Sequence, residues 1–173
     1  MHIKKIKRGV FMDAKKLSVV VKISVIAMAV CGILMCALWL PYSTYISVVG
    51  AGAQPTAEQN VAVWVQVAFY CAACVPCFVI LAFVWKIADA IKGDRAFSAE
   101  VAKLIMRAAV TLYADIAFFM VGNIVFAALG WNEFFFVYFV VAVIAVVVAS
   151  IFCVIAHYVS KAAYLQKETE GLI

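Results

Sequence analysis

The sequence predicts an all-α integral membrane protein, with four transmembrane helices in an antiparallel bundle and both termini in the cytoplasm. Three observations support this fold class: 69% of the 173 residues are hydrophobic, only 13% are charged, and the cationic residues are confined to a few short segments. A soluble domain has about a quarter of its residues charged. A lipid bilayer is therefore the solvent that this chain requires.

The length of the chain limits it to one membrane domain. A bilayer core about 30 Å thick needs about 20 apolar residues per helix, so four spans take up roughly half of the chain. The remainder is too short for a separate soluble domain. We expect a basic cytoplasmic arm over residues 1–18, a four-helix transmembrane domain over residues 19–159 and a cytoplasmic tail over residues 160–173.

The positions of Lys and Arg predict the orientation of the spans. Neither residue type occurs between residues 23 and 85 or between residues 108 and 160. Loops that stay in the cytoplasm are enriched in Lys and Arg, so we expect the arm, the connector over residues 86–107 and the tail on the cytoplasmic side of the membrane. The net charge of +5 then reflects topology and attraction to anionic lipid headgroups, and no direct contact with nucleic acid.

The first span is expected over residues 19–40, with Lys22 reaching the inner headgroups and Pro41 ending the helix. Residues 42–60 then form the one sizeable outer loop. A secretory signal cleaved after Ala51-Gly52-Ala53 is an alternative. The apolar run before it is longer than the about 7–15 residues of such a signal, which favours an uncleaved anchor.

The second span is expected over residues 61–85 and contains Pro76, which removes a backbone hydrogen bond and can kink the helix. The connector should continue this helix through Ile91 and turn around Gly93. It should restart a helix at Ser98, which is a favourable N-cap residue.

The third span is expected over residues 108–130 and the fourth over residues 134–156, with a short outer turn between them. Each matches the length that a bilayer requires. Asn123, inside the third span, is expected to form a hydrogen bond across helices.

Asp115 lies deep inside the third span. A carboxylate in hydrocarbon costs at least about 2.5 kcal/mol, so Asp115 should be protonated, hydrogen-bonded, or in contact with water or a partner. Two interpretations stay open: a proton or ion site (or a contact for a membrane partner), and a protonated structural acid bonded within the bundle. Residues expected at a similar depth predict a polar layer there, composed of Asp115, Thr111, Ser150, Cys74 and Cys77.

All six cysteines lie inside apolar runs, whereas a secreted disulfide framework places them in loops. Cys74-Val75-Pro76-Cys77 is a CxxC motif of the kind found in thiol oxidoreductases, and four-helix membrane enzymes that pass electrons from thiols to quinone carry such a pair. Here the pair is expected near mid-membrane, where desolvation disfavours the reactive thiolate. We therefore favour a packing role, and predict no catalytic residue, cofactor or metal site.

A stretch of the connector resembles a signature of the bacterial four-span membrane proteins catalogued as domain of unknown function 2975. It reads Ala90-Ile91-Lys92-Gly93-Asp94-Arg95-Ala96-Phe97-Ser98. The tail over residues 163–173 resembles the acidic segment, closed by apolar residues, with which that family ends. Departures are Val101, where Asn is common, and Gly171. The resemblance implies an inner-membrane bundle, often encoded beside a small helix-turn-helix regulator, and it brings no catalytic residues.

These features together predict a non-enzymatic interaction or regulatory protein in the bilayer, which presents its connector and tail to a cytoplasmic partner. That partner is the small helix-turn-helix regulator or another cytoplasmic protein, and a homo-oligomer is also compatible with the sequence. One alternative is a proton- or ion-linked transport element that uses Asp115. Another is an intramembrane thiol oxidoreductase that uses Cys74 and Cys77. The candidate partner-binding residues are Lys92, Gly93, Asp94, Arg95, Phe97 and Ser98.

Overall fold

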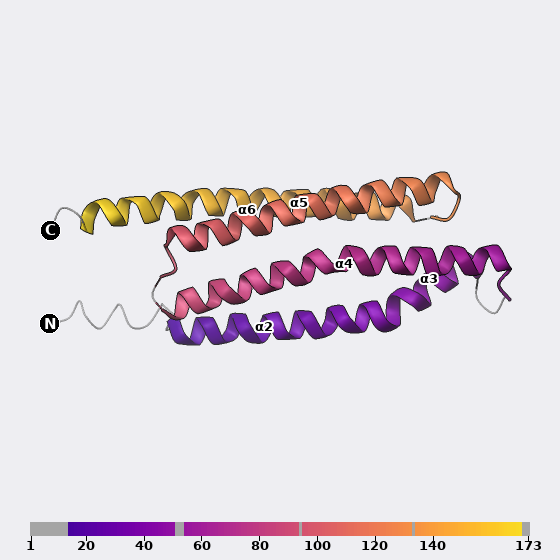
Figure 1. The fold of residues 1–173 in the computed structure, drawn as a ribbon, viewed down its shortest axis with the longest axis horizontal. Helices are drawn as coiled ribbons and strands as arrows, with labels where there is room; N and C mark the ends of the chain where they lie inside the picture. The colour runs from indigo at the N-terminus through magenta and orange to yellow at the C-terminus, as the bar shows by residue number, and fades with distance from the viewer. Residues whose placement is uncertain (1–13, 51–53, 94, 133, 171–173) are drawn as a thin grey trace.

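The computed structural model describes residues 14–50, 54–93, 95–132 and 134–170. Every element within these residues is helical, which confirms the all-α fold class (Figure 1). The elements are α2 (Ala14–Leu34), the π-helical turn η1 (Met35–Trp39), α3 (Leu40–Val49), α4 (Ala57–Lys92), α5 (Ala99–Ala128) and α6 (Phe135–Glu170).

Four helices in the described residues are long and apolar enough to cross a membrane, if α2, η1 and α3 are counted as one. Large Val, Ile, Leu and Phe side chains are exposed along all of them, as a surface in contact with lipid requires. At 1.5 Å per residue, the 36 residues of α6 form a helix that is longer than the thickness of a hydrocarbon core, about 30 Å. A span perpendicular to the membrane therefore does not need the whole length of α6.

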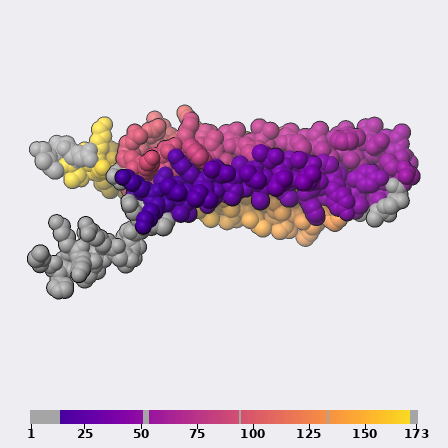
Figure 2. All heavy atoms as spheres, turned by 90° about the horizontal axis from the view of Figure 1, so that it is seen from below, coloured from indigo at the N-terminus to yellow at the C-terminus, as the bar shows by residue number. Residues whose placement is uncertain are grey.

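The helices form two pairs (Figure 1). One pair is α4 with the α2–η1–α3 helix, the other is α5 with α6, and α4 packs on α5 to join them. Figure 2 views the molecule from the side of α2, which covers much of that face beside α4. The backbones of α4 and α6 stay apart, and aromatic side chains bridge them: the rings of Tyr70 and Tyr138 have centroids 5.8 Å apart.

The prediction that Pro41 ends the first helix is wrong. The helix continues through Pro41 to Val49, after the π-helical turn η1 in which Leu40 N donates to the carbonyl of Met35. Proline has no N–H and its ring crowds the carbonyl four residues earlier, and a wider turn relieves that crowding. In lipid, ending the helix would expose more unpaired backbone groups than a local π turn does.

The outer loop expected over residues 42–60 is correspondingly shorter. Residues up to Val49 are helical, and α4 begins at Ala57. Thr56 forms a capping box with Gln59: Gln59 N donates to Thr56 Oγ1 at 3.2 Å, and Thr56 N donates to Gln59 Oε1 at 2.9 Å. This Thr-x-x-Gln pattern is a sequence signal for a helix start, which the sequence analysis did not use.

The connector folds as expected. Helix α4 passes without interruption through Pro76, ends at Lys92 and is capped by Gly93, and Arg95 N donates to the carbonyl of Ala90 at 2.9 Å. Ser98 is the N-cap of α5, because its Oγ accepts from Val101 N at 3.3 Å. We call the end of the molecule that holds this connection the connector end.

The other end is organised by the turn after α5, and we call it the Trp131 end. Gly130 has φ +71°, Trp131 N donates to the carbonyl of Phe126 at 2.9 Å, and Gly130 N donates to that of Ala127 at 3.1 Å. These bonds make a Schellman motif, for which Gly at the left-handed position is the usual residue. The rings of Phe126 and Trp131 stack with centroids 6.3 Å apart and complete the hydrophobic contact of the motif.

The expected domain limits at residues 18 and 159 both fall within helices. The arm predicted over residues 1–18 lies outside the described residues up to residue 13, and residues 14–18 already belong to α2. The tail from residue 160 continues α6 as a helix as far as Glu170. The last described part of the tail is therefore an ordered rod beside the connector.

Candidate functional site

A largely apolar cavity of about 320 Å³ lies between the two helix pairs. Helices α4, α5 and α6 line it, together with Leu40 at the start of α3. Asp115 is its one carboxylate. The lining residues are Leu40, Tyr70, Ala73, Cys74, Cys77, Leu112, Asp115, Ile116, Phe119, Tyr138, Val141, Ala142 and Ala145. We call this space the Asp115 cavity.

The Asp115 carboxyl group is poorly satisfied within the described residues. Its Oδ2 lies 4.0 Å from Sγ of Cys77, at the limit of a weak thiol hydrogen bond. Its Oδ1 is buried and has no hydrogen-bond partner there. A buried polar atom without a partner is costly in a medium of low dielectric constant. Such a group is a candidate for a functional role, because packing alone does not account for it.

The structure brings together three of the five residues of the predicted polar layer. Asp115, Cys74 and Cys77 line one cavity, whereas Thr111 and Ser150 do not line it. The Ser150 hydroxyl instead lies 2.7 Å from that of Tyr113 and donates to the carbonyl of Val146 at 2.8 Å. Depth along a helix does not determine which way a side chain faces, and Ser150 faces Tyr113 rather than the Asp115 cavity.

Cys74 and Cys77 are free thiols, and Cys74 is partly buried while Cys77 is exposed. Cys36, on η1, interacts with the Cys71 and Cys74 thiols from the neighbouring helix. Among the described residues, no three His, Cys, Asp or Glu side chains lie where they could share a metal ion.

A polar network at the Trp131 end escaped the sequence analysis. Gln66, only 3% exposed, donates from Nε2 to the carbonyl of Trp131 at 2.8 Å. Asn132 donates from Nδ2 to Oδ1 of Asn123 at 2.8 Å. The sequence signal was Gln66 itself, an isolated amide in an otherwise apolar and charge-free span, since polar residues in such spans usually have a specific partner.

Asn123 is the centre of this network, and its predicted bond across helices is confirmed. It is fully buried; Oδ1 also accepts from the Tyr70 hydroxyl of α4 at 3.2 Å, and Nδ2 donates to the carbonyl of Phe119 at 2.8 Å. All three bonds are local or lie between α4, α5 and the Trp131 turn. The network therefore joins the two helix pairs at this end.

A second cavity, of about 460 Å³, lies at the connector end between the connector and the tail. We call it the connector groove. Phe97 and Tyr164 are 61% and 63% exposed, so two aromatic side chains lie open on opposite walls. The lining residues are Arg95, Phe97, Ser98, Ala99, Ser160, Ala163, Tyr164, Gln166 and Lys167.

The six candidate partner-binding residues divide into two groups. Arg95, Phe97 and Ser98 line the connector groove. Lys92 is exposed and does not line the groove, and Gly93 caps α4. Asp94 lies outside the described residues.

Lys22 holds α2 against α4 at the connector end. Its ammonium group forms an ion pair with Asp89 and lies 4.8 Å from the ring centroid of Trp85. One turn earlier the buried Ser18 hydroxyl donates to the carbonyl of Ala88 at 2.7 Å. In the structure the Lys22 ammonium group contacts α4, and its expected reach to the inner headgroups stays a prediction.

Comparison with known protein families shows to which family this chain belongs. A family described as protein of unknown function, DUF2975, matches residues 47–173. That range is well over half of the chain. The chain belongs to the DUF2975 family. No curated protein and no solved structure matches it.

The DUF2975 match includes every candidate site residue. It begins at Ser47, near the end of α3, and takes in all of α4, α5 and α6. Asp115, the CxxC motif, the connector and the tail therefore belong to the family region. The helix α2, which Lys22 attaches to α4, precedes it.

Proposed function

We propose that this protein is a bacterial inner-membrane interaction protein, whose four spans run in alternating directions with both termini in the cytoplasm. The absence of Lys and Arg from residues 23–85 and 108–160 supports that orientation. It makes the connector end cytoplasmic and the Trp131 end external. The connector groove is then the surface that receives a cytoplasmic partner.

The observation that carries this proposal is that the connector and the tail form one groove. These segments lie more than sixty residues apart in the chain, and Arg95 and Phe97 of one line the same cavity as Tyr164 and Lys167 of the other. The same two segments carry the resemblance to the DUF2975 family. Exposed aromatic side chains with cationic neighbours are typical of protein-binding surfaces.

The chemistry of the groove indicates the kind of partner. Phe97 and Tyr164 offer two apolar faces, and Arg95 and Lys167 offer two cations beside them. An acidic segment that carries an apolar side chain fits this arrangement, since opposite charges steer encounter and fix register. A segment of the small regulator expected beside this family, or of another cytoplasmic protein, is the proposed occupant.

Site-specific photo-crosslinking in native membranes tests the proposal. Benzoylphenylalanine placed at position 97 or 164 should form a discrete adduct with one partner. The same probe at Phe136, which is 75% exposed near the opposite end, is the matched control and should give lipid adducts only. Mass spectrometry then identifies the partner.

Charge reversal separates the groove from the rest of the cytoplasmic surface. Arg95→Glu should abolish the adduct from position 164, because Arg95 lines the groove. Lys92→Glu changes the same charge on an exposed residue that does not line it, and should leave the adduct intact. Equal adducts in both variants, or no protein adduct at either position, would refute the proposal.

A second candidate function rests on the Asp115 cavity: a proton- or ion-linked transport element. It is supported by the buried and unpartnered Oδ1 of Asp115, in a cavity of about 320 Å³. In proteoliposomes under an imposed membrane potential, Asp115→Asn should reduce proton flux to the level of protein-free vesicles. Equal flux in the Asn variant, or no flux with the natural protein, would exclude this role.

A further inference from the structure

Three cavities follow one another from the Trp131 end to Asp115. The first, which we call the Glu58 cavity, has a volume of about 210 Å³. The second, the Thr44 cavity, holds about 70 Å³ and shares Ser47 and Trp131 with the first. The third is the Asp115 cavity, which shares Leu40, Tyr70 and Tyr138 with the second. Consecutive cavities thus have common walls.

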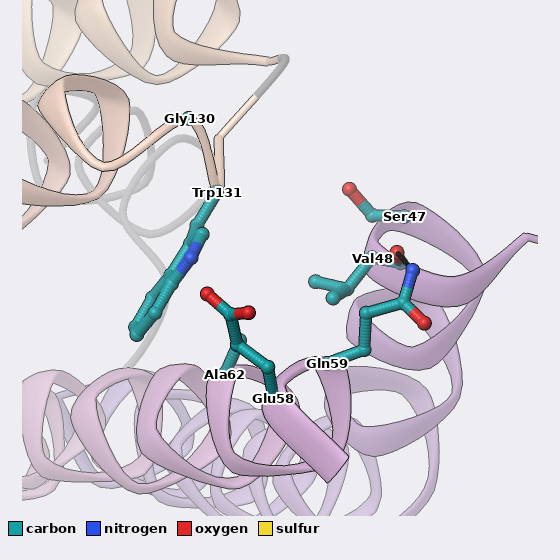
Figure 3. A pocket seen from close by; sticks show the side chains of 7 residues that line it. All are labelled: Ser47, Val48, Glu58, Gln59, Ala62, Gly130 and Trp131. Carbon is teal, nitrogen blue, oxygen red and sulfur yellow. Dashed lines mark hydrogen bonds between the residues drawn. The ribbon is translucent and has the colours of Figure 1, made fainter. Parts of the chain in front are cut away.

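The Glu58 cavity contains an acidic residue. Figure 3 shows the Glu58 carboxylate pointing from the first turn of α4 toward the Trp131 side chain, with Ser47 across the opening. Helix α4 begins at Ala57, and Glu58 lies in its first turn. A single exposed carboxylate attracts cations and raises their local concentration.

The Thr44 cavity is lined by hydroxyl and amide groups. Ser43, Thr44 and Ser47 face it from α3, Gln66 from α4 and Asn132 from the Trp131 turn. Thr44 and Gln66 are only 5% and 3% exposed. This group of buried polar side chains offers the donors and acceptors that water needs.

The π-helical turn explains why α3 presents its hydroxyl groups here. Leu40, Ser43, Thr44 and Ser47 follow the spacing of one helix face. One extra residue in a helical turn rotates every later residue by about 100°. The turn η1 before Pro41 therefore directs this face of α3 toward the cavities instead of toward lipid.

We propose that these cavities form an access route, by which protons reach Asp115 from the Trp131 end. The proposal rests on the second candidate function and adds its direction and its ligand. The route begins at Glu58, passes the hydroxyl groups of α3 and ends at the unpartnered Oδ1 of Asp115. Tyr70 and Tyr138 lie where the Thr44 cavity meets the Asp115 cavity.

The Asp115 cavity favours a proton over a metal cation. A cation in hydrocarbon needs several oxygen ligands to replace its water, and the lining offers few oxygens besides the carboxylate. The titratable groups that face Asp115 are Cys74, Cys77 and Tyr70 of α4 and Tyr138 of α6, while Leu40 lines the cavity from α3. None of these carries a positive charge that would compete with a proton.

Infrared spectroscopy of the full protein in lipid vesicles tests the route. The carbonyl band of the protonated Asp115 carboxyl is assigned by its loss in Asp115→Asn. After transfer to D2O the band should shift rapidly in the natural protein. In Ser47→Phe the shift should be much slower, because Ser47 lines both outer cavities. Ser24→Phe is the matched control, since Ser24 is exposed on α2 and bonds only to the carbonyl of Val20.

The outcomes separate the route from the transport function. Fast exchange in the natural protein and in Ser24→Phe, with slow exchange in Ser47→Phe, supports the route whatever the flux assay gives. Equal exchange in the natural protein and Ser47→Phe overturns the route, even if Asp115→Asn abolishes flux. A natural protein with no exchangeable Asp115 band at any pD also overturns it. A band that sodium removes at constant pD would assign the site to that cation and overturn the proton.

Discussion

The Tyr70 hydroxyl donates a hydrogen bond to Oδ1 of the fully buried Asn123. The two residues belong to α4 and α5 and are 53 positions apart in the chain. Asn123 Oδ1 accepts a second bond from Asn132. One side-chain oxygen thus connects α4, α5 and the Trp131 turn. The position of α4 relative to the α5–α6 pair depends on this contact, and so does the shape of the cavities beside it.

Replacing Asn123 should weaken the packing of the two helix pairs. Asn123→Ala removes the acceptor that the Tyr70 hydroxyl and the Asn132 Nδ2 share. Interhelical hydrogen bonds in membranes average about 0.6 kcal/mol, and a buried unpaired donor adds about 1–3 kcal/mol. Unfolding in detergent mixtures, followed by circular dichroism, should show that the free energy of unfolding falls by about the sum of these two contributions.

A double-mutant cycle with Tyr70→Phe measures the bond itself. If the two side chains interact as the structure indicates, the double variant should lose less stability than the sum of the single variants. Strict additivity would mean that this hydrogen bond does not contribute.

Gly122 should not tolerate a side chain. A Cβ built on Gly122 of α5 would lie 2.1 Å from Cζ of Phe69 on α4. The Phe69 ring cannot move freely, because it stacks on Phe118 at 4.9 Å and packs edge-on against Phe126 at 5.1 Å. Overpacking of this kind costs about 1–3 kcal/mol, so Gly122→Ala should lower the free energy of unfolding by about that amount.

Gly32 provides the matched control. Its added Cβ would lie 3.2 Å from Cζ of Phe78, a tight but adjustable contact. Gly32→Ala should therefore have a much smaller effect in the same unfolding assay. Equal effects of the two substitutions would show that α4 and α5 can separate to make room.

Lys22 should contribute to the attachment of α2. Lys22→Met removes the ion pair with Asp89 and the contact with the Trp85 ring. The Lys22 and Asp89 side chains are 24% and 53% exposed, so the pair is screened, and we expect about 1 kcal/mol in total from the two contacts. Asp89→Asn should lose less, because the ring contact stays.

The control is Lys16→Met, on the exposed surface of the same helix. It removes the same charge from an exposed position and should leave the free energy of unfolding unchanged. Raising the salt concentration should reduce the difference between the natural protein and Lys22→Met, since exposed ion pairs are screened. A difference that does not depend on salt would assign the effect to the ring contact alone.

Local signals predicted the parts of the fold that depend on local chemistry. Gly93 and Ser98 marked the end of α4 and the start of α5 to within about a residue. Pro41 misled because the rule that proline ends a helix holds where water can bond to the freed backbone groups. In lipid no such partner exists, and the π turn is the less costly solution.

For the candidate site, the sequence indicates which residues lie at a similar level along their helices, but not which way their side chains face. Counting residues from the membrane surface placed Cys77 near Asp115, and the structure agrees. The rotation of each helix was not accessible, so Ser150 was assigned to a layer that it does not join. The partners of Gln66 and the groove between Phe97 and Tyr164 depend on how distant helices pack, which no single span encodes.

Replacing Asp115 tests whether it is a functional or a structural acid, because the two roles predict opposite changes in the free energy of unfolding. If its carboxyl group serves the fold, Asp115→Leu should destabilise the protein. We expect the opposite, because Oδ1 is buried without a partner and the cavity has room for an apolar side chain. Removing an unsatisfied buried polar group should raise the free energy of unfolding by about 1–3 kcal/mol.

The control for packing is Ile116→Leu, because Ile116 lines the same cavity and the substitution keeps the volume and polarity of the side chain. Its effect on the free energy of unfolding should stay below about 1.5 kcal/mol in magnitude. Detergent unfolding of both variants gives the comparison. A gain in stability for Asp115→Leu, together with a loss of proton flux, would mean that the protein retains a destabilising carboxyl group for its activity. A loss of stability instead would show that the Asp115 carboxyl group holds the helices together.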